Sequence, residues 1–159
     1  MGQKDIPLND FGKKQAEILK PILKNLDFEY IAYSPLLRAH QTAEILFEDK
    51  KIFKEPIEEL KEWNFGDWEG RIWDRLHLEN VDQIIPPNGE TKDVFFNRAL
   101  QGINKAINRP ESVLIVGHSG IYWAICHFAK IEKVNIDNCQ IVQLNPSQDK
   151  SNWEIKIID

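Results

Sequence analysis

The chain has 159 residues, 42% of them hydrophobic and 28% charged, which is the composition of a single globular domain with a substantial core. Its 20 Lys and Arg residues against 25 Asp and Glu residues give a net charge of -5 without a long basic cluster, which argues against nucleic-acid and membrane-surface partners. The two cysteines form no C-x-x-C motif and no apolar run reaches the length of a signal peptide or membrane span, so we expect a cytoplasmic protein.

The first predicted element is a helix that begins after Asn9, whose side chain can accept hydrogen bonds from the free main-chain N–H groups of the first turn. Apolar residues recur along it at helical spacing: Phe11, Ala16, Leu19 and Leu23. Pro21 lies inside this pattern and has no N–H to donate, so we expect it to kink or divide the helix near residue 20.

A short strand at 29–33 and a second helix at 36–47 are predicted next, with Ser34 as the N-cap and Pro35 at the first helical position. Arg38 lies in the first turn of this helix, where the helix dipole disfavours a cation unless an anion is bound beside it. A phosphate would remove that penalty, and a guanidinium can bind phosphate with two parallel hydrogen bonds. The alternative for Arg38 is an exposed side chain or an ordinary salt bridge.

The segment 60–70, which follows a predicted strand at 51–54, places three aromatic residues and two glycines in one loop. Aromatic surroundings can desolvate a carboxyl group and raise its pKa, as a general acid that works near neutral pH requires. Glu62, Asp67 and Glu69 all fit that role, and their spacing does not choose among them. We expect the rings themselves to fill the core: Trp63, Phe65 and Trp68.

The turn at 86–89 precedes a further helix, which is predicted to end at Asn108. Apolar residues follow one another along it at spacings of four: Phe95, Ala99, Ile103 and Ile107. The apolar run Val113–Val116 then has no polar alternation, which predicts a strand buried on both faces, as in a parallel sheet covered by helices.

His118 directly follows this strand, between Gly117 and Gly120, and a helix is predicted over 121–129. Free N–H groups and the positive end of the helix dipole favour a bound anion at such a junction. The alternative is a structural histidine in a tight turn. Two last strands, at 139–144 and 153–158, are expected in the outer part of the sheet. Alternating strands and helices predict a layered α/β fold, in which the junctions bearing Arg38 and His118 lie along one edge.

Five stretches of the sequence resemble, in order, motifs of the histidine phosphatase superfamily, the phosphoglycerate mutase-like phosphatases. Residues 34–43 match the pattern S-x-L-x-R-A-x-Q-T-A, and residues 62–70 match E-x-x-x-G-x-W-E-G. Residues 5–16 resemble the stretch after the family's first active-site loop, 88–91 its glycine–acid–hydroxyl turn, and 116–120 its second histidine motif. The resemblance implies a three-layer α/β/α sandwich with a mostly parallel central sheet.

The resemblance also implies a role for particular residues. Arg38, His118 and Ser119 would bind the phosphoryl group, and His118 would stabilise charge in the transition state. Glu62 matches the acid that protonates the leaving oxygen. The scheme needs no metal ion and no organic cofactor, and its partner is a small-molecule phosphate ester.

The family's nucleophile is a histidine in an Arg-His-Gly motif at the end of a first, central strand. None of the four histidines, His40, His77, His118 and His127, lies in such a context. We therefore expect the motif and its strand upstream of residue 1, so that residues 1–159 form a single, N-terminally truncated domain. His40 is an unsuitable substitute, because two residues further along a helix it points away from the direction of Arg38.

Two functions follow from the resemblance. The first is a phosphomonoesterase that acts through a phosphohistidine intermediate. The alternative is a catalytically inactive relative that only binds phosphate-bearing ligands. Within the enzyme class, a phosphatase is preferred to a phosphoglycerate mutase, because only a short segment separates Gly70 from Gly89, whereas family mutases carry longer insertions here.

Overall fold

A three-stranded parallel sheet in the order β2-β1-β3 lies at the centre of the fold. The computed structural model describes residues 2–48, 52–70, 85–147 and 152–158. The helices are α1 (Asp10–Leu23), α2 (Leu37–Phe47), α3 (Lys92–Ile107) and α4 (Ser119–Ala129). The strands are β1 (Tyr30–Tyr33), β2 (Phe53–Pro56), β3 (Val113–Val116), β4 (Ile141–Pro146) and β5 (Trp153–Ile158), and two 3-10 helices are η1 (Glu58–Leu60) and η2 (Gly66–Trp68).

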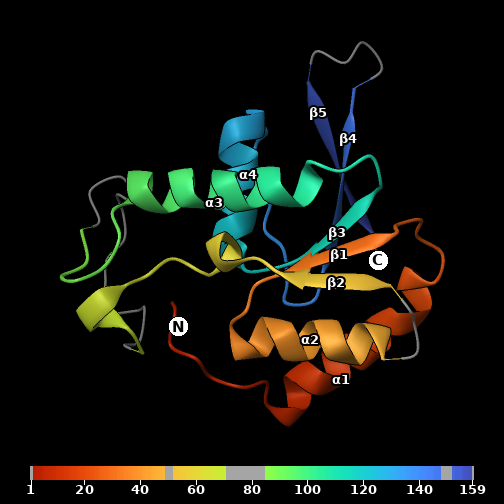
Figure 1. Ribbon diagram of the computed structural model, residues 1–159, viewed down its shortest axis with the longest axis horizontal. Coiled ribbons are helices and arrows are strands. Elements are labelled where there is room, and N and C mark those ends of the chain that lie inside the picture. Colours follow the sequence, from red (N-terminus) through yellow and green to blue (C-terminus); the bar gives the residue numbers. More distant parts are fainter. Residues whose placement is uncertain (1, 49–51, 71–84, 148–151, 159) are drawn as a thin grey trace.

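Helices cover both faces of this sheet (Figure 1). Ile31 of β1 packs into a buried cluster with residues of α1 and α2, whereas its neighbours Tyr30 and Ala32 pack into the cluster that α3 and α4 complete. This alternation follows from the two-residue period of a strand, which sends successive side chains to opposite faces. The predicted three-layer α/β/α arrangement with a parallel sheet is confirmed.

All three parallel strands end at the same edge of the sheet. Tyr33, the last residue of β1, lies opposite both Pro56 of β2 and Val116 of β3. In Figure 1 these carboxyl ends point left, toward the loop that carries η2 and toward the N-terminal residues. The edge is therefore the place where the loops after β1, β2 and β3 meet.

The first helix begins as predicted and ends differently. The Asn9 side chain caps α1, because its Oδ1 accepts a hydrogen bond from the Gly12 N–H at 2.8 Å. The predicted division near residue 20 is wrong, since α1 continues through Pro21 to Leu23. Pro21 lies in the last turn of α1, and its missing N–H removes one helical hydrogen bond there. The helix tolerates this loss because main-chain groups near a helix end lack helical partners in any case.

Two predictions about the sheet are also corrected. All four residues of β3 are half-buried rather than buried, because β3 pairs with β1 alone among the described strands. The strands β4 and β5 pair with each other in an antiparallel hairpin and, within the described residues, are not hydrogen-bonded to the parallel sheet. The first hairpin strand begins at Ile141 instead of residue 139.

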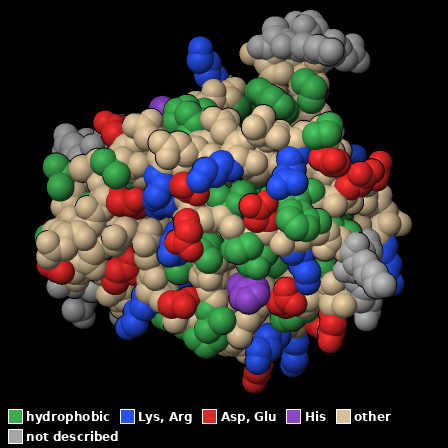
Figure 2. Space-filling model, in the orientation of Figure 1, with side chains coloured by type: hydrophobic (Ala, Val, Ile, Leu, Met, Phe, Trp, Pro, Cys, Tyr) green, Lys and Arg blue, Asp and Glu red, His purple; other side chains and the backbone are tan. Residues whose placement is uncertain are grey.

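The distribution of charged side chains on the surface and the length of the helices both bear on the expectations drawn from the composition. On the face that Figure 2 shows, acidic and basic side chains are interspersed rather than gathered by sign. Among the described residues, no helix is both long enough and apolar enough to pass through a bilayer.

Candidate active site

The junction of β1 and α2 is built around Ser34, the one polar residue among the fully buried side chains of the described part. The sequence predicted Ser34 as the N-cap of the helix, which is wrong, because α2 begins at Leu37 and the capping position is Leu36. Ser34 instead continues the sheet ladder through its N–H, which donates to the Val116 carbonyl at 3.0 Å. Its Oγ accepts from the Leu36 N–H at 3.3 Å.

The Ser34 hydroxyl also joins the first junction to the second. Its Oγ lies 2.7 Å from Nε2 of His118, the residue between β3 and α4. Either atom can be the donor, because the tautomer of a neutral imidazole decides that role. The two strand–helix junctions that the sequence singled out therefore lie side by side at one edge of the sheet, as predicted.

Arg38 lies in the first turn of α2 and binds the N-terminal segment. Its guanidinium donates to the main-chain carbonyls of Gly2 at 2.7 Å and Lys4 at 3.1 Å. Within the described residues it forms no ion pair with a carboxylate, so its positive charge is balanced only by more distant groups. Burial lowers the pKa of Arg38, opposed by the charges of Glu62, Asp5 and Glu69. A half-buried arginine without a direct counter-ion is suited to bind an anion.

Glu62 lies between η1 and η2, with its carboxyl group against the start of α4. One oxygen accepts from the Trp63 N–H at 2.8 Å. The other faces the Gly120 N–H at 3.3 Å and the Ser119 hydroxyl at 3.4 Å. Burial raises the pKa of Glu62, and the hydrogen bonds from Trp63 and Gly120 and the charge of Arg38 oppose that rise. A carboxyl group that keeps its proton to a higher pH is suited to general acid catalysis.

The other two acidic residues of this loop have different surroundings. Asp67 is exposed and accepts hydrogen bonds from the Asn88 side chain. The Glu69 carboxylate accepts from three main-chain N–H groups: Gln3 at 2.6 Å, Lys4 at 3.0 Å and Phe65 at 3.0 Å. Glu69 thus fastens to this loop the same N-terminal segment that Arg38 binds. Of the three carboxylates that the sequence left open, Glu62 is the one bonded to the start of α4.

The remaining histidines lie elsewhere or outside the described residues. His40 stacks on Tyr33, with ring centroids 5.2 Å apart, and approaches Glu44 at 3.9 Å. His127 packs against Phe96 on the other side of the sheet from α2. His77 lies outside the described residues. Among the described histidines, the structure brings His118 into the group with Arg38 and Glu62.

His118 is held in its neutral form. Burial, and next the positive charges of Arg38 and Arg98, lower its pKa from 6.5 to about 3. A neutral imidazole beside a buried cation can donate one hydrogen bond to an anion without a charge of its own.

The stability of the fold should depend on the protonation of His118. Between pH 6.5 and pH 3 the unfolded chain binds a proton that the folded chain does not, so stability falls as the pH is lowered. We expect urea unfolding to show a free energy of unfolding lower at pH 5 than at pH 7 by about 1–2 kcal/mol from this group. His118→Gln, which removes the titrating group, should reduce the difference by that amount.

Inorganic phosphate provides the control for this prediction. A bound anion raises the pKa of the imidazole, so phosphate should flatten the pH dependence of the free energy of unfolding in the unaltered chain. The pH dependence of the same free energy in His118→Gln should not change. An equal dependence on pH in both proteins would contradict the burial of a neutral His118.

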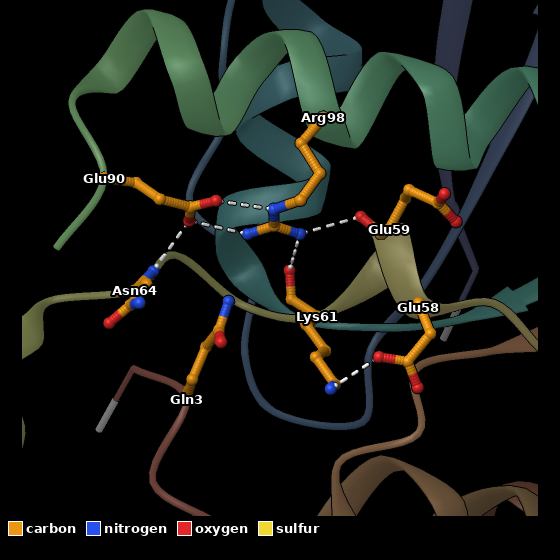
Figure 3. A pocket seen from close by; sticks show the side chains of 7 residues that line it. All are labelled: Gln3, Glu58, Glu59, Lys61, Asn64, Glu90 and Arg98. Atoms are coloured by element: carbon orange, nitrogen blue, oxygen red, sulfur yellow. Dashed lines mark hydrogen bonds and ion pairs between the residues drawn. The ribbon is translucent and has the colours of Figure 1, made fainter.

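Sequence reasoning missed Arg98, a residue of α3 that lies behind Glu62. It borders a cavity of about 370 Å³ (Figure 3), whose lining comes from four separate parts of the chain: Gln3, Glu58, Glu59, Lys61, Asn64, Glu90 and Arg98. Arg98 and its partner Glu90 are eight residues apart, one on a helix and one before it. That separation matches no helical contact, so the sequence held no signal for the pair.

The described residues do not form a metal site. Within 2–48, 52–70, 85–147 and 152–158, no group of three or more His, Cys, Asp and Glu side chains is placed to hold a metal ion. The titratable groups at the edge of the sheet include Arg38 and Glu62, with neutral His118 at the junction of β3 and α4.

A family model and several curated relatives match the chain. The model of the histidine phosphatase superfamily (branch 1) matches residues 1–157. The chain is 34% identical over 127 residues to an uncharacterized phosphatase, PhoE, of Bacillus subtilis (strain 168), with 78% of this chain and 65% of that protein covered. It is 30% identical over 132 residues to the adenosylcobalamin/alpha-ribazole phosphatase of Salmonella typhimurium, with 76% and 65% covered. The matches thus span slightly less than two thirds of these relatives' length.

Solved structures share the fold. YhfR of Bacillus stearothermophilus superposes with a TM-score of 0.85 at 22% identity, over 99% of this chain and 86% of that one. The alpha-ribazole phosphatase of Shigella flexneri gives a TM-score of 0.83 at 25% identity, again over 99% and 86%. The path of the described chain is therefore that of these proteins.

Proposed function

Because the chain belongs to the histidine phosphatase superfamily (branch 1), we propose that it forms part of an enzyme that hydrolyses small phosphate monoesters. The observation that supports the proposal is the meeting of Arg38, Glu62 and His118 at the edge where β1 and β3 end. An arginine without a direct counter-ion, a neutral imidazole and a carboxyl group of raised pKa are the groups that phosphoryl transfer to a histidine requires.

The proposed reaction has two steps. In the first, a histidine nitrogen attacks phosphorus, the bond between phosphorus and the ester oxygen breaks, and Glu62 gives its proton to the departing oxygen. In the second, water attacks phosphorus, the bond between phosphorus and the histidine nitrogen breaks, and the Glu62 carboxylate takes a proton from that water, which frees the histidine and releases inorganic phosphate. The Arg-His-Gly motif that supplies this histidine in the family does not occur in the 159 residues. The proposal assigns it to a segment upstream of residue 1.

The phosphoryl group would lie between the two junctions. Two of the five N–H donors of Arg38 go to the carbonyls of Gly2 and Lys4, and the proposal assigns the others to phosphoryl oxygens. His118 would donate a hydrogen bond to the same group, and Ser119 would add its hydroxyl at the start of α4, where the helix dipole favours negative charge. These roles stabilise charge as it develops on the equatorial oxygens.

A phosphatase is preferred to a phosphoglycerate mutase on the length of the segment between Gly70 and Gly89, of which residues 71–84 lie outside the described residues. The named relatives support a small ester as the substrate, because one of them is an adenosylcobalamin/alpha-ribazole phosphatase.

The test is a phosphate-release screen over a panel of esters that includes p-nitrophenyl phosphate, alpha-ribazole phosphate and sugar phosphates. It is run on this chain and on a form extended by the residues read in frame upstream of residue 1, each with a His118→Ala control. Release by the extended form that falls about 100-fold or more in His118→Ala would support the proposal. Phosphate binding without release in either form would favour the binding-only alternative. Release by the present chain that survives His118→Ala would contradict the assigned site.

A further inference from the structure

Arg98 uses its whole guanidinium to bind Glu90 and the main chain of residues 59–62. Its Nε and one terminal nitrogen donate to the two carboxylate oxygens of Glu90, both at 2.7 Å. The same terminal nitrogen donates to the Glu62 carbonyl at 3.1 Å, and the other donates to the carbonyls of Glu59 and Lys61, both at 2.9 Å. These five contacts equal the number of N–H donors that an arginine has. Arg98 therefore has no donor to spare for a ligand.

Glu90 extends the anchor to the residues after Glu62. Its carboxylate accepts from the Asn64 N–H at 3.0 Å, and its main-chain N–H donates to the Asn64 carbonyl at 2.9 Å. Its own carbonyl accepts from the indole N–H of Trp63 at 2.7 Å. Figure 3 shows Arg98 descending from α3 between Glu90 on one side and the loop on the other. The main chain is thus held before, at and after residue 62.

These contacts fix the carboxyl group of Glu62 without touching it. The Glu62 carbonyl is bound by Arg98 and by the side chain of Gln3 at 2.9 Å, while its carboxyl group faces Gly120. The charge of Arg98 is balanced at close range by the bidentate pair with Glu90, and this pair is largely shielded from solvent. Arg98 thus reaches Glu62 through the main chain, whereas its charge is one of the causes that lower the pKa of His118.

We infer that Arg98 is a positioning residue, which holds the main chain of residue 62 so that the Glu62 carboxyl group stays against the start of α4. The inference rests on the proposed function, because position matters only if Glu62 exchanges a proton with the leaving oxygen. Without the anchor, the loop would relax toward solvent, and the acid would spend less time within reach of that oxygen.

The first test measures geometry in this chain and needs no catalysis. The Glu62 carboxyl group is titrated by carbon-13 NMR, and the Gly120 N–H resonance is followed in the same samples. Arg98→Lys keeps the positive charge but loses the planar fork. We expect it to move the Gly120 resonance and to lower the pKa of Glu62 by about one unit as the carboxyl group gains water. If Arg98 acted on Glu62 through its positive charge, a weaker charge effect would raise the pKa of Glu62. The direction of the pKa shift therefore distinguishes positioning from a purely electrostatic role.

Two further variants keep this test decisive. Glu90→Gln preserves the shape of the anchor and removes its ion pair, so it should move the Gly120 resonance in the same direction with a smaller size. That resonance decides the matter if Arg98→Lys does not fold, because the loss of the Glu90 charge by itself also lowers the pKa of Glu62. Arg109→Lys is the matched control, because Arg109 is an exposed partner of Glu55 beside β2 and has no contact with the Glu62 loop among the described residues. An unchanged Glu62 titration and Gly120 resonance in folded Arg98→Lys or Glu90→Gln would overturn the inference.

The second test uses an extended form that releases phosphate. An alkyl phosphate needs a proton on its leaving oxygen, whereas the p-nitrophenolate of p-nitrophenyl phosphate leaves without one. Arg98→Lys should therefore lower kcat for the alkyl ester about 10-fold to 100-fold, within the range that a general acid contributes, and lower kcat for p-nitrophenyl phosphate much less. Equal losses on both esters would contradict positioning of the acid. A failure of the proposed function would instead appear as no release from either ester, with the NMR result unaffected.

Discussion

Replacing Arg38 with alanine is expected to weaken binding of a phosphate-like oxyanion by about 100-fold or more, because two charge-assisted hydrogen bonds are each worth about 1.5–3 kcal/mol. The guanidinium lies partly buried in the first turn of α2, with no carboxylate paired to it among the described residues. Its loss would leave His118 as a neutral group without the neighbouring positive charge. Isothermal titration calorimetry with orthovanadate and with inorganic phosphate measures the effect.

Two other variants show whether the loss comes from the anion site itself. Arg38→Lys keeps the charge and loses the fork, so it should retain an intermediate affinity, about 10-fold below the unaltered chain. Glu69→Gln loosens the N-terminal segment that Arg38 also binds while leaving the guanidinium in place, so it reports the contribution of that segment. Equal oxyanion affinity in the unaltered chain and in Arg38→Ala would remove the basis of the proposed phosphate site.

Replacing Trp63 with alanine is expected to lower the free energy of unfolding by about 3–5 kcal/mol, a large part of the stability of a domain of this size. The indole is 1% exposed and stacks between Phe65 and Phe95, with ring centroids 5.2 Å and 5.3 Å away. Its N–H donates to the Glu90 carbonyl at 2.7 Å, so truncation leaves both a cavity and an unpaired acceptor. Urea unfolding followed by far-ultraviolet circular dichroism measures the loss.

Trp153 is the matched control for this experiment. It lies on β5 and is 46% exposed, so Trp153→Ala should cost less than about 1 kcal/mol. Trp63→Phe keeps the stacked ring but removes the N–H, and should give a loss between the two. If Trp63→Ala were no more costly than Trp153→Ala, the packing of the Glu62 loop against α3 would be wrong.

Much of the local structure could be read from the sequence. The helical spacing of Phe95, Ala99 and Ile103 predicted α3, and all three side chains are buried. Asn9 predicted the start of α1, and its side chain is the cap. Such features depend on residues within a few positions of one another, so their period and their capping chemistry are written in the order of the residues.

The errors arose where a local rule competed with a distant contact. Ser34 has the sequence context of an N-cap, but the His118 imidazole and the Val116 carbonyl, from another strand, take its hydroxyl and its N–H. The strand β3 is continuous in apolar residues, yet its burial depends on how many strands lie beside it. The hairpin β4–β5 was recognised, but not its separation from the parallel sheet, because pairing between sheets leaves no mark in a single strand.

By itself the sequence determined the kinds of chemical group that this protein brings to the edge of its sheet: an arginine in a first helical turn, a histidine after an apolar strand and acidic residues in an aromatic loop. Only the tertiary structure decided which of them act together. It brought His118 into contact with Ser34, which lies 84 positions earlier in the chain. Of the three candidate carboxylates, it placed Glu62 against Gly120, which lies 58 positions later. It also anchored the main chain of Glu62 to Arg98. The physical reason is that hydrogen bonds and desolvation act over a few ångströms in space, and the path of the folded chain alone decides which distant residues come within that range.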